Sequence, residues 1–160
     1  MPKLLVMSDS HQNISRMMYA AEKSKPDAII HLGDHISDAH ELQLLFPDTM
    51  YYMVKGNCDY GAGESELLLE FGGVRLYMTH GHIHGVKRGL DELVNAARQK
   101  DAALALYGHT HKALIQQLPG LWLMNPGQME RHDSKRPASY GIITIENGSY
   151  NCRIEYLPFN

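Results

Sequence analysis

Cysteine is scarce in this sequence, with only Cys58 and Cys152 among 160 residues. The two form no CxxC pair and no disulfide framework, which favours a reducing compartment, so a cytoplasmic protein is expected. Long apolar runs are also missing. The N-terminal stretch MPKLLVMSDSH contains four consecutive apolar residues, too few for a signal peptide or a membrane span, so no membrane association is expected.

A strong excess of either charge is absent as well. The formal net charge is −3 at pH 7, which gives no general reason to expect nucleic-acid binding, so any phosphate recognition must be local. The sequence contains no internal repeat, low-complexity tract or flexible linker. Its length is that of one domain, so residues 1–160 are expected to form a single domain without a cap domain.

Histidine, by contrast, is abundant, with ten in the chain. Neutral imidazole is the commonest metal ligand among side chains. The places of these histidines relative to the expected strands therefore decide which chemistry the sequence favours.

The first third of the chain alternates between short apolar runs and helical patterns. Strands are expected at three places: residues 4–7, 28–32 and 51–54. Asn13 can cap a helix that must end before Pro26. A capping box of Asp38 and Glu41 predicts a second helix that runs through Leu45. This order of elements favours parallel strands joined by right-handed crossovers.

The rest of the chain is typical of antiparallel pairing. Tight-turn dipeptides predict three hairpins, at residues 72–73, 119–120 and 147–148. The first hairpin joins strands at 67–71 and 74–79, and a helix at about 88–99 then precedes a strand at 103–107. Parallel units followed by hairpins predict an α/β fold in which two mixed β-sheets pack face to face with helices outside.

Every conspicuous polar cluster follows one of the expected strands. The clusters are SDSH at 8–11, GDH at 33–35, GNCD at 56–59, THGHIHG at 79–85 and GHTH at 108–111. Ligands bind at the carboxyl ends of strands in open α/β sheets, so these five loops are expected to converge on one site. Glycines in the loops allow sharp turns and a close approach of the backbone.

Seven side chains in these loops offer oxygen or imidazole nitrogen to a metal: Asp9, His11, Asp34, Asn57, His80, His109 and His111. Seven ligands are too many for one tetrahedral ion, but with one bridging carboxylate they supply four contacts to each of two ions. Two ions about 3.5 to 4 Å apart can share a hydroxide and clamp the oxygens of a phosphoryl group. Metal-assisted hydrolysis is therefore the favoured reaction.

The same motifs resemble those of the calcineurin-like metallophosphoesterases. DSH at 9–11, GD at 33–34, GNCD at 56–59, HGH at 80–82 and GHTH at 108–111 are most similar to the YfcE-like branch of small bacterial and archaeal phosphodiesterases. With NPG at 125–127, the resemblance spans nearly the whole chain. It implies a four-layer αββα sandwich of two mixed β-sheets flanked by helices, with a binuclear metal centre at the strand ends.

Carried over position by position, the resemblance implies two metal sites that share one carboxylate. The first metal would be held by Asp9, His11, Asp34 and His111. The second would be held by Asp34, Asn57, His80 and His109. Manganese is the expected metal, with iron, nickel and zinc as alternatives, because the ligand set itself does not single out one ion.

Cys58 departs from the pattern of many relatives, which have histidine after the asparagine. Catalytic roles are expected at four positions: Asn57, Cys58, His80 and His109. A thiol with an ordinary pKa of about 8.5 is a different acid from imidazolium and cannot stabilise negative charge as a cation. The expected enzyme is therefore a modest phosphatase that favours small diesters with good leaving groups.

The other histidines have weaker claims on the site. His82 and His84 could touch the substrate or support a ligand, with an ordinary loop role as the alternative. His35 could reach the edge of the site. The remaining ones are expected to be structural or solvated: His31, His40 and His132.

A few further residues are open to two interpretations. Asp59 could orient a neighbouring group of the site or could simply form a turn. Arg131, Lys135 and Arg136 could grip a phosphate, or could belong to the solvated surface. Cys152 is expected to be a small buried apolar residue.

Two other functions remain open from the sequence. A protein-interaction scaffold with the same fold is one, because a eukaryotic relative in the retromer coat uses this fold for protein contacts. A mononuclear iron site of two histidines and one carboxylate is the other, although the surplus of ligands argues against it. The expected partner is a small phosphoester, such as a cyclic nucleotide, another nucleotide diester or a phosphomonoester, and homo-oligomerisation is left open.

Overall fold

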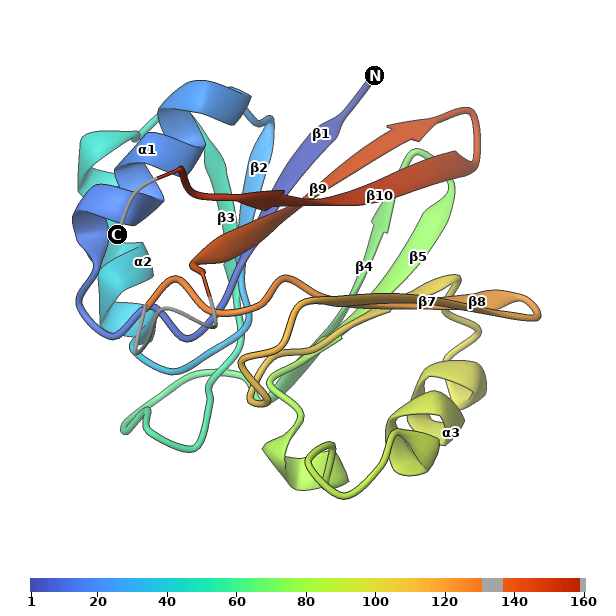
Figure 1. The fold of residues 1–160 in the computed structure, drawn as a ribbon. Coiled ribbons are helices and arrows are strands. Elements are labelled where there is room, and N and C mark those ends of the chain that lie inside the picture. Colours follow the sequence, from blue (N-terminus) through green and yellow to red (C-terminus); the bar gives the residue numbers. More distant parts are fainter. Residues whose placement is uncertain (131–136, 159–160) are drawn as a thin grey trace.

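The computed structural model describes residues 1–130 and 137–158. Strands in this part of the chain form two mixed sheets (Figure 1). The first sheet has the order β10-β9-β1-β2-β3, made of β1 (Lys3–Met7), β2 (Ala28–His31), β3 (Met50–Met53), β9 (Ser139–Glu146) and β10 (Ser149–Tyr156). The second has the order β4-β5-β6-β8-β7, made of β4 (Glu66–Phe71), β5 (Val74–Thr79), β6 (Leu104–Leu106), β7 (Leu114–Leu118) and β8 (Leu121–Asn125).

Helices cover the outer face of each sheet, as Figure 1 shows. The helices are α1 (Ile14–Ser24), α2 (Ile36–Leu45) and α3 (Asp91–Gln99), with a short 3₁₀ turn η1 (His82–His84). Helices α1 and α2 pack on the first sheet, whereas α3 packs on the second. The expected sandwich of two mixed sheets between helical layers is confirmed.

Alternating side chains of β1 show how the four layers are held together. Leu4 and Val6 point into the core between the sheets, where they join Leu76 and Leu106 of the second sheet. Leu5 and Met7 point to the opposite face and pack under α1 and α2. Each fully buried leucine or valine contributes about 1.5–3 kcal/mol, so both faces of this strand stabilise the fold.

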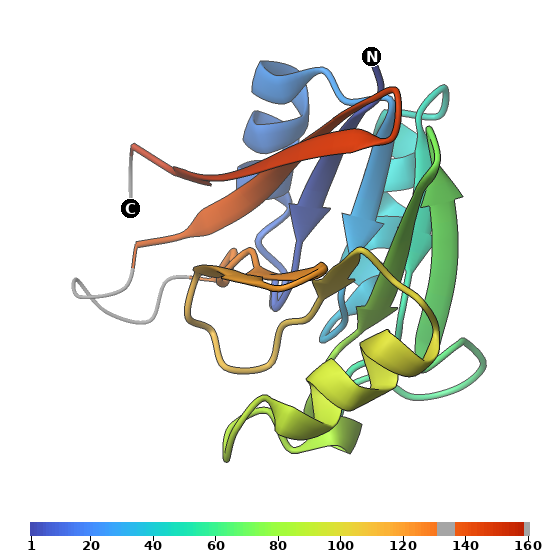
Figure 2. The same cartoon turned by 90° about the vertical axis from the view of Figure 1, so that its right-hand side faces the viewer.

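Parallel pairing joins the strands that lead into the polar loops. β1 pairs with β2 and β2 with β3 in parallel, and β5, β6 and β8 are also parallel neighbours. The C-terminal hairpin of β9 and β10 adds to the free edge of β1 in antiparallel fashion, and Figure 2 shows it in orange and red beside the dark-blue β1. The hairpin expected at Gly72-Gly73 is confirmed, since Phe71 pairs with Val74.

The start of α2 differs from the sequence prediction. The helix begins at Ile36, so Asp38 lies in its first turn and does not cap it. The Asp38 carboxylate instead accepts hydrogen bonds from the Ser10 hydroxyl (2.7 Å) and the Gln12 amide (2.8 Å). The predicted capping box is therefore wrong, because a contact with a distant loop takes this side chain away from the helix end.

Two other helix starts also differ in detail. Asn13 does occupy the N-cap position of α1, but its side-chain amide donates to the Ser10 carbonyl (2.8 Å) and not to the helix. Helix α3 begins at Asp91 and not near residue 88, because the chain from Gly85 to Arg88 forms a turn closed by a hydrogen bond between their backbones. In the described ranges, no helix is long and apolar enough to cross a membrane.

Candidate metal centre

Loops from both sheets meet at the carboxyl ends of the strands. The Asp9 amide donates to the Gly33 carbonyl (3.0 Å), which joins the loops after β1 and β2. The Gly108 amide donates to the His80 carbonyl (2.9 Å), which joins the loops after β5 and β6. The His109 amide reaches across to the Asp9 carboxylate (3.2 Å), so the two halves of the site come from different sheets.

His80 lies at the centre of the convergence and is fully buried. Its Nδ1 atom is 2.7 Å from the Leu32 carbonyl, which can only accept, so Nδ1 carries the proton and the Nε2 atom of the neutral ring has a lone pair. The Nε2 atom is surrounded by four potential ligand atoms: Asn57 Oδ1 at 3.1 Å, His109 Nδ1 at 3.2 Å, Asp34 Oδ1 at 3.6 Å and Asp9 Oδ1 at 3.9 Å.

These atoms fit a cation. With the His80 proton on Nδ1, Asn57 Oδ1 and His80 Nε2 are both acceptors 3.1 Å apart, and a cation beside them would bind both. The neighbouring carboxylates of Asp9 and Asp34 add two negative charges. A set of oxygens and imidazole nitrogens without thiolate suits a divalent ion of borderline to hard character.

The candidate ligands form two groups within the described residues. In one, potential ligand atoms of Asp9, Asp34 and His80 all lie within 4.8 Å of one another. In the other, those of Asp9, His11 and His111 do, with His111 Nε2 at 3.1 Å from Asp9 Oδ1. Asp9 is common to both groups as the side chains lie, so the bridging role assigned to Asp34 stays a prediction.

The protonation states suit metal binding at neutral pH. Burial would raise the pKa of Asp9, but the hydrogen bond with His111, the electrostatic interaction with His80 and the Ser8 hydroxyl outweigh it and lower the pKa to about 2. Burial, followed by electrostatic interactions with His80 and Lys87, lowers the pKa of His109 to about 4. An ionised Asp9 and a neutral His109 are the forms that bind metals.

The backbone of the candidate ligands is unusual. Five of the seven have φ in the left-handed region: Asp9 (54°), His11 (44°), Asp34 (63°), His109 (70°) and His111 (63°). Left-handed backbone costs a residue with a side chain about 1–2 kcal/mol. Such residues cluster where function demands a particular direction of the side chain, so this local strain marks the loops as a functional site independently of the ligand chemistry.

Glycines let the loops approach the carboxylates closely. A Cβ atom on Gly56 would collide with the Asp34 carboxylate and would lie 2.6 Å from its backbone nitrogen. One on Gly108 would collide with the Ser8 hydroxyl and lie 2.9 Å from Asp9 Oδ2. Both positions need glycine because the space beside the carboxylate is already taken.

Asp59 orients the site loops, as one of its two sequence interpretations expected. Its carboxylate accepts hydrogen bonds from three backbone amides: Gly56 (2.8 Å), Asp34 (2.8 Å) and Ile36 (3.0 Å). Burial raises its pKa, but these three amides outweigh burial and lower it. Asp59 thus ties the loop after β3 to the loop after β2, and it satisfies the first amide of α2 in place of a local cap.

Asn125 is a supporting residue whose role the sequence did not reveal. Its side-chain amide donates to the Gly108 carbonyl (3.1 Å) and contacts the Thr110 hydroxyl (3.0 Å), while its oxygen accepts from the Gly127 amide (2.9 Å). It therefore holds the loop that carries His109 and His111. The NPG motif marked the position, but only the fold shows which loop it supports.

The remaining histidines divide as follows. His35 lies at the edge of the site, with its ring 4.6 Å from that of His11. The His82 ring is 5.4 Å from that of His80, whereas His84 contacts the Tyr77 hydroxyl (3.1 Å) and is structural. His31 is fully buried and structural, and the others lie elsewhere: His40 is exposed, and His132 lies outside the described residues.

Cys58 is exposed at the rim, and its backbone amide donates to Asp34 Oδ1 (3.0 Å). Partial burial, followed by the negative charge of Asp34, raises the pKa of the thiol.

Cys152 is buried in the core between the sheets, as expected. The cluster of Arg131, Lys135 and Arg136 lies outside the described residues.

Sequence comparison relates the chain to phosphoesterases. Residues 3–148 match the model of the calcineurin-like phosphoesterase superfamily domain. The "Probable metallophosphoesterase YsnB" of Bacillus subtilis is 35% identical over 154 residues, which cover 94% of this chain and 88% of the relative. The "Phosphodiesterase YfcE" of Escherichia coli is 33% identical over 101 residues, 56% of this chain and 50% of the relative.

Comparison with solved structures agrees with the sequence comparison. A predicted phosphoesterase from Streptococcus pneumoniae TIGR4 superposes with a TM-score of 0.80 at 26% identity, covering 98% of this chain and 93% of that chain. Vacuolar Protein Sorting 29 from Cryptosporidium parvum gives a TM-score of 0.74 at 17% identity, covering 98% and 97%. The second likeness shows the fold alone, whereas the family match extends over most of the sequence.

Proposed function

This chain belongs to the calcineurin-like phosphoesterase superfamily, and on that premise we propose that it is a phosphodiesterase that hydrolyses small phosphodiesters at a centre of two divalent metal ions. The observation that carries the proposal is the convergence on His80 Nε2, where an amide oxygen, a second imidazole and two carboxylates come within 3.1–3.9 Å. Such a concentration of potential ligand atoms favours a bound cation.

The proposed ligands divide into two sets. One ion would be held by Asp9, His11, Asp34 and His111. The other would be held by Asp34, Asn57, His80 and His109. Divalent ions at these positions would activate water and neutralise charge that develops on phosphoryl oxygens. Manganese is the proposed metal, with iron, nickel and zinc as alternatives, and a cytoplasmic location is proposed from the scarcity of cysteine.

The chain's own groups prepare this chemistry. The Leu32 carbonyl fixes the His80 ring with its proton on Nδ1, so Nε2 faces the site as a ligand. The Cys58 amide holds Asp34 in place from the other side. Asp59 fixes the loop after β2 and the loop after β3 by accepting hydrogen bonds from the backbone amides of Asp34 and Gly56. Rigid placement of this kind is what lets ligands hold ions without reorganisation during reaction.

The nature of Cys58 sets the expected limits of the activity. The raised pKa of its thiol keeps it protonated at neutral pH, so it can donate a hydrogen bond but brings no positive charge. A phosphomonoester carries one more negative charge than a diester, and an alcohol that is a poor leaving group needs a stronger proton donor than a thiol. Diesters with good leaving groups are therefore the preferred substrates.

The test is a phosphoester panel run with protein reconstituted in each candidate metal. We expect two ions per chain and turnover of activated diesters such as bis(p-nitrophenyl) phosphate, with little turnover of monoesters. One ion per chain at saturation would contradict the binuclear assignment and favour a mononuclear site. Metal-loaded protein that hydrolyses no ester would favour the scaffold alternative.

A further inference from the structure

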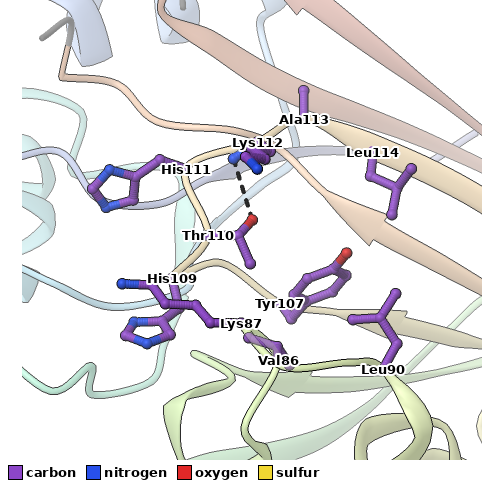
Figure 3. A pocket seen from close by; sticks show the side chains of 10 residues that line it. All are labelled: Val86, Lys87, Leu90, Tyr107, His109, Thr110, His111, Lys112, Ala113 and Leu114. Carbon is purple, nitrogen blue, oxygen red and sulfur yellow. Dashed lines mark hydrogen bonds between the residues drawn. The ribbon is translucent and has the colours of Figure 1, made fainter.

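A cleft of about 680 Å³ lies beside the proposed metal centre (Figure 3). Two of the candidate ligands, His109 and His111, form part of its wall. Its volume lies in the range of about 300–1,000 Å³ that is usual for small-molecule sites and is much larger than a phosphate group needs. The cleft therefore has room for the part of a substrate that lies beyond the scissile phosphate.

One side of the cleft is apolar. Leu90, Leu114 and the ring of Tyr107 lie away from the two histidines in Figure 3, and Val86 and Ala113 complete this wall. The wall comes from the segment between η1 and α3, from the segment that joins β6 to β7 and from the first residue of β7. An apolar wall next to a metal centre suits a substrate with an aromatic or other apolar group, because burying that group's surface contributes to binding.

The formally charged side chains that line the cleft are all of one sign. Lys87 and Lys112 line it, and none of the described residues that line it is a carboxylate. This arrangement runs against the net charge of the chain, which is −3. Figure 3 shows the amine of Lys87 beside the His109 ring, and its charge contributes to lowering the pKa of that ring. Two lysines outside the ligand set favour a second anionic group on the substrate.

Resting on the proposed phosphodiesterase function, we propose that this cleft selects phosphorylated nucleotide diesters, in which a base packs on the apolar wall and a further phosphate lies between Lys87 and Lys112. The scissile phosphate would lie at the metal centre and the second phosphate at the lysines. The apolar wall alone would accept any aromatic diester. The lysines add the requirement for an additional negative charge.

Two dinucleotides test the requirement for charge directly. ApA and its 5′-phosphorylated form pApA contain the same scissile diester and differ by one terminal phosphate. We expect kcat/KM to be about tenfold higher for pApA, with bis(p-nitrophenyl) phosphate run beside both as a measure of basal diesterase activity. If that reporter is not hydrolysed, the proposed function itself fails. If it is hydrolysed but pApA has no advantage over ApA, only the substrate class is wrong.

Lysine variants test which groups supply the preference. Lys87→Met and Lys112→Met should each lower the ratio of kcat/KM for pApA over ApA by about threefold, because each removes one of the two partly exposed charge contacts proposed for the terminal phosphate. The control is Lys23→Met, an exposed lysine on α1 away from the cleft, which should keep the wild-type ratio. A ratio unchanged in the Lys87→Met, Lys112→Met double variant would overturn the assignment of these lysines.

Discussion

The two sheets contribute different chemistry to the same site. Loops of the first sheet carry the proposed oxygen ligands, since Asp9, Asp34 and Asn57 follow β1, β2 and β3, together with the imidazole of His11. Loops of the second sheet carry imidazoles, since His80 follows β5 and both His109 and His111 follow β6. The carboxylates therefore lie on one side of the proposed centre, and most of the imidazoles lie on the other, next to the lysine-lined cleft.

The two sides also differ in how tightly they are held. Asp9 and Asp34 are buried and are fixed by backbone amides from neighbouring loops, whereas His109 and His111 are half-buried on the wall of the cleft. His80 is the buried exception on the second sheet, so we expect a division between the buried residues, which would hold the ions, and His109 and His111, which would border the substrate. The predictions below test this division, beginning with the largest expected effect.

Asp34→Asn should have the largest effect, because it removes a charge from the buried side without changing the size of the side chain. Even partners of metal ligands typically contribute 10–100-fold to metal affinity or activity, so loss of a proposed ligand should lower kcat/KM by more than about 100-fold. Metal content per chain and diester turnover measure the result. The exposed Asp48→Asn is the matched control, and equal activity of the two variants would refute the ligand role of Asp34.

His31 on β2 tests how the buried first side responds to acid. Burial lowers its pKa from 6.5 to about 4, and Ser10 and the Gly33 amide contact its two nitrogens. Below pH 6.5 the unfolded chain binds a proton that the native imidazole does not, so the contribution of His31 alone should lower the free energy of unfolding by about 3 kcal/mol as the pH drops from 6.5 to 4. Urea unfolding at several pH values measures this slope.

The comparison that isolates this contribution uses two histidine variants. His31→Gln should be less stable than the wild type at pH 7, because it disturbs buried hydrogen bonds, but its stability should depend less on pH between 6.5 and 4. His40→Gln, at an exposed position of α2, should keep the slope of the wild type. Parallel slopes for all three proteins would show that His31 titrates normally.

Gly56→Ala tests the close approach of the loop after β3 to Asp34. The added methyl group would displace the carboxylate or the loop, which should cost about 1–3 kcal/mol of stability and weaken metal binding. Gly89→Ala is the control, because a Cβ atom there meets nothing within 4 Å, and it should be neutral or slightly stabilising. Equal melting temperatures and metal contents for the two variants would contradict the packing at Gly56.

Cys58→His places an imidazole on the side of the first sheet and has the smallest expected effect. A protonated imidazole can donate a proton and can stabilise charge, so turnover of monoesters should rise by about tenfold, below the usual range for an optimally placed acid. Cys58→Ser is the matched control, since a hydroxyl brings no positive charge. Unchanged turnover of monoesters and diesters in Cys58→His would remove the thiol as an explanation of modest activity.

The sequence was informative about the site because its signals are local. Each buried strand is a short apolar run, and the polar cluster begins where the run ends, as at Met7 and Asp9 or Leu32 and Asp34. Parallel strands then bring those ends together, so the convergence of the loops could be predicted before any coordinates. The metal roles of the individual residues remain predictions of the same kind.

Other features depend on residues that are far apart in the sequence, so the local sequence pattern could not predict them. The capping box at Asp38 and Glu41 fits the local pattern, but Asp59 satisfies the start of α2 and Asp38 binds Ser10. The pairing of β9 with β1 joins segments from opposite ends of the sequence. The lysine-lined cleft is a further example, since Lys87 and Lys112 are ordinary exposed residues in the sequence until the fold brings them to the same cleft.

The left-handed backbone at five of the candidate ligands has a consequence for how such a protein can change over time. Glycine relieves the strain at such positions, so replacing His109 or His111 by glycine would tend to relieve strain in the metal-free fold while it removes a proposed ligand. Selection for stability and selection for catalysis therefore act in opposite directions on the same few positions. A lineage that no longer needed the reaction would lose its ligands by becoming more robust.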